Sequence, residues 1–275
     1  MNYRTLLVHL DDGSRDDYLD IAARLAVRFA AELAGAYLVP TRELTPFTSA
    51  LLPGSVVAHH LRDSGDAQAR AEARFREVAI RHGLPSSSFS APAGRAVDGA
   101  IAHARCADLC VLSQPRTDDS HAGFASDLAH AVIMQSGRPA LVIPFGDAVP
   151  DIGRRVLVAW KDARESARAA ADALPFLVAA DEVVVIAITA PNAEDETHGA
   201  KIESWLARHG VRAQVRHEVA EDVDAGNLLL SRAADFSSDL IVMGAYSRPR
   251  LSEVVLGGVT RLMLQAMTVP VLMSH

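Results

Sequence analysis

A short stretch near the C-terminus carries the residue types that could bind an anion. An apolar run at 240–243 meets Gly244, as a buried parallel strand does where it opens into a loop. The Gly257-Gly258 pair then precedes a helix that we expect over 259–266. Backbone amides at such a helix start, with the positive end of the helix dipole, are a common way to hold a phosphate. The stretch therefore predicts a phosphate-type anion site.

The same stretch occurs a second time earlier in the chain. Residues 108–113 align with 239–244, and 139–142 then fall on 270–273 without a gap. The front parts also match, since 3–11 pair with 153–161. The chain is therefore a tandem repeat of one domain. We expect a first domain at 1–146 and a second at 152–275, here called the first and second halves, joined by a link short enough to keep them packed together.

Composition favours a globular protein with two domains. The chain has 275 residues, of which 49% are hydrophobic and 22% charged. No apolar run approaches the roughly 20 residues of a membrane helix, and the first residues enter a strand at once, so we expect neither a membrane span nor a secretory signal, and a cytoplasmic location. A net charge of −7 gives no general attraction to nucleic acid or to acidic membranes.

Each half alternates apolar strands with amphipathic helices, which predicts an α/β fold with a mostly parallel five-stranded sheet, doubly wound by helices on both faces. In the first half we expect a long helix ending near residue 33, an irregular insertion at 41–61 and a helix at 66–82, and in the second half a helix over 165–178. The insertion, rich in Pro, Ser, Thr and Gly, would act as a flap or a docking surface. Ligands of such sheets bind at the carboxyl ends of the strands. Asp11, Lys161, Gly244 and Tyr246 are expected at those ends.

The residues quoted above resemble the universal stress protein family in its tandem form, over nearly the whole chain. The resemblance rests on an Asp-containing turn after strand one, on a loop pattern of Gly, two residues, Gly, nine residues, Gly and then Ser or Thr, and on the closing Val-Pro-Val-Leu. It implies an adenine nucleotide alpha-hydrolase-like fold. Members with the full pattern bind ATP, with the Asp near the adenosine and the loop at the phosphates. It also implies that residues 140–143 and 271–273 pair across a pseudo-twofold axis.

This sequence departs from the family pattern in both halves. In the second half Gly244 and Gly257 match, but Ser247 replaces the middle glycine, Gly258 the Ser or Thr, and Lys161 the Asp. The phosphate side is partly kept.

The first half has lost the nucleotide pattern. Asp11 matches, but the four loop positions hold Ser113, Arg116, Ser126 and Asp127. We expect Ser126 or Asp127 to cap the following helix, and a carboxylate there would repel a phosphate.

The candidate ligand-binding residues are therefore those of the second half. Their glycines could instead serve a tight loop or close packing of helix on sheet. Lys161 could reach a phosphate, or it could be a solvated replacement of the lost Asp. The full set is Gly244, Tyr246, Ser247, Gly257, Gly258, Val259, Thr260 and Lys161.

The sequence gives little support for metal or redox chemistry. His59-His60 has no partner at a recognised ligand spacing, and no catalytic residues are identified. Cys106 and Cys110 are expected to be buried apolar residues.

The leading function is a stress-response binding or signalling protein that binds ATP or another adenine nucleotide in its second half. The alternative is a nucleotide-free family member that acts through protein partners or as a homo-oligomer, and a weak ATPase is third.

Overall fold

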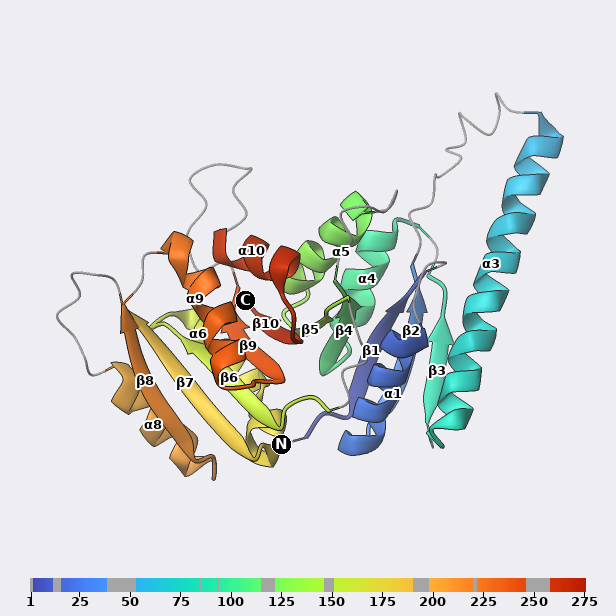
Figure 1. The fold of residues 1–275 in the computed structure, drawn as a ribbon. Coiled ribbons are helices and arrows are strands. Elements are labelled where there is room, and N and C mark those ends of the chain that lie inside the picture. The colour runs from blue at the N-terminus through green and yellow to red at the C-terminus, as the bar shows by residue number, and fades with distance from the viewer. Residues whose placement is uncertain are drawn as a thin grey trace.

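The computed structural model describes residues 2–11, 16–38, 53–84, 86–92, 94–114, 122–145, 151–189, 198–219, 222–245 and 258–275. Strands and helices alternate along the chain, as the sequence predicts (Figure 1). The strands are β1 Thr5–Leu10, β2 Glu32–Tyr37, β3 Ser87–Ser90, β4 Leu109–Ser113, β5 Ala140–Ile143, β6 Arg155–Trp160, β7 Glu182–Thr189, β8 Ala213–Val219, β9 Leu240–Gly244 and β10 Val271–Ser274. The helices are α1 Asp16–Phe29, α3 Gly54–Arg81, α4 Ala96–Ala104, α5 Ala122–Gln135, α6 Arg164–Asp172, α7 Leu174–Ala179, α8 His198–Arg208, α9 Asp222–Asp235 and α10 Gly258–Ala266.

All ten strands form one continuous sheet in the order β3-β2-β1-β4-β5-β10-β9-β6-β7-β8. Counted from its outer edge, each half has the same strand order, because β8, β7, β6, β9 and β10 correspond to β3, β2, β1, β4 and β5. The two halves are therefore related by a pseudo-twofold axis. Every neighbouring pair is parallel except β5 and β10, which run antiparallel with Leu141 opposite Leu272. The expected pairing of 140–143 with 271–273 is confirmed. The division at 146–152 stays a prediction, because residues 146–150 lie outside the described ranges.

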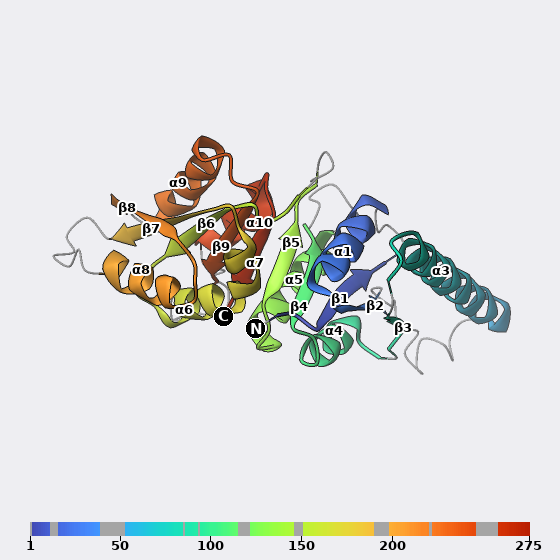
Figure 2. The ribbon, with the colours of Figure 1, turned by 90° about the horizontal axis from the view of Figure 1, so that it is seen from below.

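Helices cover both faces of the sheet (Figure 2). Side chains alternate along each strand, so Leu6 and Val8 enter one core while Leu7 enters the other. The first core packs under α1, α3, α6, α7 and α8, and the second under α4, α5, α9 and α10. Strands that are buried on both faces read as continuous apolar runs, which is why the sequence identifies them well.

An aromatic cluster joins the halves on the face that α1 and α7 cover. The rings of Tyr3 and Phe29, and those of Phe29 and Phe176, meet edge to face with centroids 5.0 Å apart. The Tyr3 hydroxyl donates to the carbonyl of Asp172, 2.6 Å away and 169 residues later in the chain. These contacts fix the relative position of the halves in addition to the strand pair.

One aspartate in each repeat secures the start of the first strand of its half. The Asp108 carboxylate accepts hydrogen bonds from the amides of Arg4 and Thr5, at 2.8 and 3.0 Å. Asp239 accepts in the same way from the amides of residues 153–155. These repeated aspartates therefore have a structural role at the amino ends of the strands, opposite the expected ligand edge.

Helix α1 ends four residues before the predicted end at residue 33. Ala30 adopts a left-handed conformation with φ of 51°, and the amide of Ala31 bonds back to the Ala26 carbonyl at 2.9 Å. Glycine normally marks this helix ending, and its absence hid the boundary in the sequence. Ser237, with φ of 49°, ends α9 in the same way.

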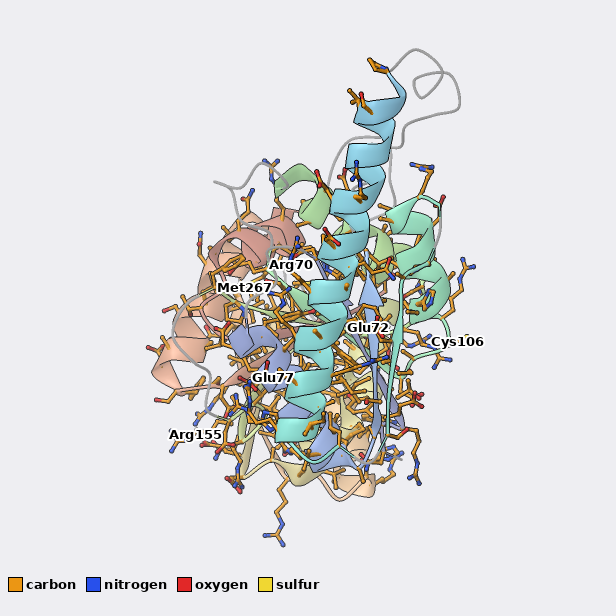
Figure 3. The ribbon with its side chains drawn as sticks, turned by 90° about the vertical axis from the view of Figure 1, so that its right-hand side faces the viewer. Arg70, Glu72, Glu77, Cys106, Arg155 and Met267 are labelled. Atoms are coloured by element: carbon orange, nitrogen blue, oxygen red, sulfur yellow. The ribbon has the colours of Figure 1, made fainter. Side chains whose placement is uncertain are left out.

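Helix α3 is longer than predicted and replaces part of the expected irregular insertion. It begins at Gly54 after Pro53, not near residue 66. Its 28 residues span about 42 Å, and its first turns extend past the body of the protein (Figure 3). Residues 39–52, which hold the rest of the insertion, lie outside the described ranges, so the proposed flap stays a prediction.

Two further expectations are wrong in detail. The helix expected over 165–178 is split into α6 and α7 at Ala173, one residue before a turn that contains Pro175. Cys106 is exposed at the edge of the molecule, after the end of α4 (Figure 3). Cys110 is buried as expected, and burial raises the pKa of its thiol to about 12, so it stays protonated.

Replacing Ala30 by Gly should raise the free energy of unfolding by about 1 kcal/mol, because glycine adopts the left-handed conformation without the steric cost that alanine has. Replacing Ala69, which is exposed within α3, by Gly should lower the free energy of unfolding by about 1 kcal/mol, because glycine is a poor helix former. Urea titrations of both variants measure the difference. Destabilisation by Ala30→Gly would contradict this account of the helix ending.

The Tyr3→Phe variant should lose about 1 kcal/mol of stability through its missing hydroxyl. Tyr18→Phe is the matched control, because the Tyr18 hydroxyl bonds to the Val111 carbonyl at 2.5 Å within the first half. Only Tyr3→Phe should speed amide hydrogen exchange in α7, which belongs to the second half and packs against Tyr3 and Phe29 of the first half. Equal exchange in the two variants would show that this hydroxyl does not hold the halves together.

Candidate functional site

The candidate site residues come from the carboxyl ends of β6 and β9, which are adjacent parallel strands, and from the start of α10. Lys161 follows β6, Gly244 ends β9 and Gly258 begins α10. Val259 and Thr260 belong to the first turn of α10. The predicted site residues Tyr246, Ser247 and Gly257 lie outside the described residues, so their roles stay predictions.

Among the described residues, none blocks the start of α10. Gly258 is exposed, and apart from its chain neighbours and its own helix backbone no described atom lies within 4 Å of the position that a Cβ would occupy there. The first four amides of a helix have no partner inside the helix. The first turn contains no acidic residue, so these amides and the helix dipole present positive potential. This arrangement suits an anion.

Arg261, which the sequence analysis does not identify, strengthens this potential. It is exposed in the first turn of α10. A cation at a helix N-terminus is unfavourable for the helix itself, and a bound anion would offset that cost. The sequence places Arg261 within the helix that follows Gly258. Only the observed start of that helix shows that the Arg261 charge lies in its first turn.

The rest of α10 is firmly held on the sheet. Thr260 is 2% exposed, Val259 is half-buried, and Met263 is fully buried in the core under α9 and α10. Gly226 of α9 allows close contact, because a Cβ there would lie 2.6 Å from the Leu262 side chain. Thr260 therefore packs α10 in place, and the amide groups form the exposed part of the site.

Gly244 has a packing role. A Cβ at this position would lie 2.6 Å from the carbonyl carbon of Glu165 and 2.6 Å from the amide nitrogen of Ser166. The start of α6 therefore rests directly on the end of β9, and only glycine leaves room for it. Of the two explanations for the glycines, close helix packing accounts for Gly244, whereas Gly258 is open.

Lys161 is exposed among charges of both signs. Its backbone amide donates to the Ser166 hydroxyl at 3.4 Å, which ties the turn after β6 to α6. The Glu165 carboxylate is almost fully buried nearby and pairs with Arg164 at 3.0 Å. Nothing in the sequence singles out Glu165, because an acidic residue in the first turn of a helix is common.

Trp160 is a second residue near the site that the sequence pattern does not single out. Among the described side chains its indole nitrogen is buried without a hydrogen-bond partner. Buried tryptophan N–H groups usually have one. Trp160 precedes Lys161, but it packs with the core on the α6 and α8 face, away from α10.

The first half differs at the same place, and for a reason other than the predicted cap. Helix α5 begins at Ala122, so Ser126 and Asp127 lie inside it and do not cap it. The amides without helical partners are those of residues 122–125, one turn ahead of the position that matches Gly258. The extra turn includes Phe124, which is half-buried against the core of that face. Burial of this ring favours the longer helix.

The strand-one aspartate of the first half is also engaged. Asp11 is half-buried, and Arg74 of α3 donates to its backbone carbonyl at 3.1 Å. His9, two residues earlier, is buried with its Nε2 2.8 Å from the Leu38 carbonyl, and burial lowers the pKa of its ring. Ser113 ends β4, and Arg116 lies outside the described residues. The first half therefore keeps the matching Asp, but its helix does not begin at the position that matches Gly258.

The described residues contain no group of three or more His, Cys, Asp and Glu side chains arranged to hold a metal ion. Among the described helices, none combines the length and the apolar character that a membrane span requires.

Comparison with known proteins supports the resemblance stated above. The model of the universal stress protein family matches residues 153–275. No curated protein matches the chain. A universal stress protein from Archaeoglobus fulgidus DSM 4304 has a TM-score of 0.72 at 16% identity, over 98% of this chain and 95% of its own.

Two structures from Pseudomonas aeruginosa have the same fold. One is a putative universal stress protein from strain UCBPP-PA14, with a TM-score of 0.60 at 17% identity, over 99% of this chain and 93% of its own. The other is a functionally unknown protein from strain PAO1, with a TM-score of 0.60 at 18% identity, over 99% of this chain and 92% of its own. The second half of the chain matches the model of the universal stress protein family, and the whole chain has the fold of a tandem universal stress protein.

Proposed function

We propose that this protein is a stress-response binding or signalling protein that binds ATP or another adenine nucleotide through its second half. The observation that carries the proposal is the open start of α10, where exposed Gly258 leaves the first amides of the helix accessible. The phosphates would lie at these amides, with Arg261 adding a cation. The loop residues Tyr246, Ser247 and Gly257 would complete the site.

The contrast between the halves supports a single nucleotide site. Helix α5 begins a turn earlier than α10, so the amides at Asp127 and after it are used inside the helix. The family model also matches only residues 153–275, which is the half that keeps part of the glycine pattern. The first half would then serve as a packing partner for the second.

Lys161 would act at the nucleoside side of this site. The resemblance implies an Asp at this place near the adenosine, and Lys161 cannot accept the hydrogen bond that a carboxylate accepts. Its ammonium group is a mobile point charge that could instead reach a phosphate. We therefore expect phosphate contacts to contribute more to affinity here than contacts to the ribose.

The alternative function is that of a nucleotide-free family member that acts through protein partners, in the cytoplasm and as a homo-oligomer or with another chain. The position of Gly244 favours it, because packing of α6 alone explains that glycine. Hydrolysis is the third candidate, and the described residues supply no carboxylate cluster for a metal-assisted reaction. Release of a bound nucleotide from freshly purified protein, identified by mass spectrometry, would decide between the first two.

Replacing Gly258 by Asp should weaken ATP binding by about 2- to 30-fold, the range that a charge at a helix terminus supplies. Gly258→Asn is the matched control, because Asn has nearly the same shape and no charge. The open space around Gly258 admits both side chains. Calorimetric titration with ATP and AMP measures the difference. Asp127→Gly, within α5, should leave binding unchanged.

Equal ATP affinity in the wild type, Gly258→Asp and Gly258→Asn would assign the loop a structural role only. Absence of nucleotide and phosphate binding from the wild type would favour the nucleotide-free function.

The Arg261→Gln variant should bind ATP several-fold more weakly and yet be slightly more stable, by about 0.3 to 1 kcal/mol, because it removes a cation from a helix N-terminus. Thermal unfolding without ligand and calorimetry with ATP measure the two effects. A variant that loses stability and keeps full affinity would contradict a role for Arg261 in anion binding.

A further inference from the structure

The far end of α10 touches the first half of the chain. A helix leaves its last carbonyls without partners inside the helix, and the Met263 carbonyl here is taken by the amide of Met267 at 2.9 Å. The carbonyls of Leu264 and Gln265 accept hydrogen bonds from Gln114, which is 150 residues earlier in the chain. Among the described residues, Gln114 of the other half therefore caps the C-terminal end of α10.

Gln114 uses both ends of its side-chain amide. Its Nε2 donates to the Leu264 carbonyl at 3.0 Å and to the Gln265 carbonyl at 3.3 Å. Its Oε1 accepts from the backbone amide of Phe145 at 2.9 Å. The residue is 8% exposed, so water competes little with these bonds. An amide donor at a helix C-terminus also suits the negative end of the helix dipole.

The matching position in the second half cannot make the equivalent bond to α5. Gln114 follows β4 directly, and the matching position after β9 is Ala245, which has no polar side chain. The last carbonyl of α5, that of Gln135, receives Arg105 at 3.5 Å, from within the first half. Gln114 lies directly after Ser113, the first of the four positions at which the first half departs from the family pattern.

We propose that Gln114 is a positioning residue for the anion site of the other half. It fixes the C-terminal end of α10, and the amides at Gly258 belong to the same nine-residue helix. The inference rests on the proposed function, since it assigns to the first half a part in nucleotide binding by the second. Because coupling between sites is reciprocal, ATP at Gly258 should in turn strengthen the contact of α10 with Gln114.

Three variants separate the two ends of the Gln114 side chain. Gln114→Glu keeps an acceptor for Phe145 and loses the donors to α10. Gln114→Lys keeps donors and loses the acceptor, and Gln114→Met loses both without adding charge. Amide hydrogen exchange of residues 258–266, with α8 as the internal control, measures how firmly α10 is held. Calorimetry with ATP measures the site.

The Glu and Met variants should both speed exchange in α10 and weaken ATP binding about two- to tenfold, the effect of one or two hydrogen bonds. The Lys variant should stay near the wild type in both measurements, and ATP should slow α10 exchange in the wild type more than in the Met variant. Unchanged exchange and affinity in the Glu and Met variants would overturn the inference while leaving the nucleotide site intact.

If the wild type binds no ATP, the proposed function fails. Hydrogen exchange in the three variants then still decides whether Gln114 holds α10.

Discussion

The antiparallel pairing of β5 with β10 is the interaction on which the rest of the structure depends. Each five-stranded half would otherwise end in an exposed edge of unpaired backbone groups, which is an aggregation hazard. Pairing Leu141 opposite Leu272 removes both edges at once and makes one sheet of ten strands. The aromatic contacts around Phe176 and the bonds of Gln114 follow from this pairing, because it brings segments over a hundred residues apart to the same seam.

The two halves share a topology but differ at their loop helices. The difference arises at a single point, the residue at which each helix begins. Helix α5 starts at Ala122 because its first turn buries part of Phe124, whereas α10 starts at Gly258, where a Cβ would meet no other described part of the chain within 4 Å. The same fold therefore offers free amides at different positions, and the extra turn removes them from the place where a phosphate would lie.

The glycines of the second half show how a sequence motif can contain unlike parts. Gly244 is required by the close approach of α6, since any side chain would strike the backbone at Glu165 and Ser166. Gly258 meets no such limit, so its lack of a side chain matters only for what can approach the helix from outside. Gly226, outside the motif, is the one that sets α10 against α9. Packing thus explains Gly244 and Gly226, whereas Gly258 belongs to the proposed anion site.

The sequence by itself determined the tandem repeat, the α/β class and most of the strands, because strands buried on both faces leave long apolar runs. It also pointed to Gly258 and Thr260 at the start of α10. Only the tertiary structure decided the end of α1 at Ala30, the start of α5 and the hold of Gln114 on α10. Ala30 lacks the glycine that marks a left-handed helix ending, and Phe124 extends α5 through a contact with a distant core. The Gln114 bond depends on the alignment of two halves, which local residue patterns do not encode.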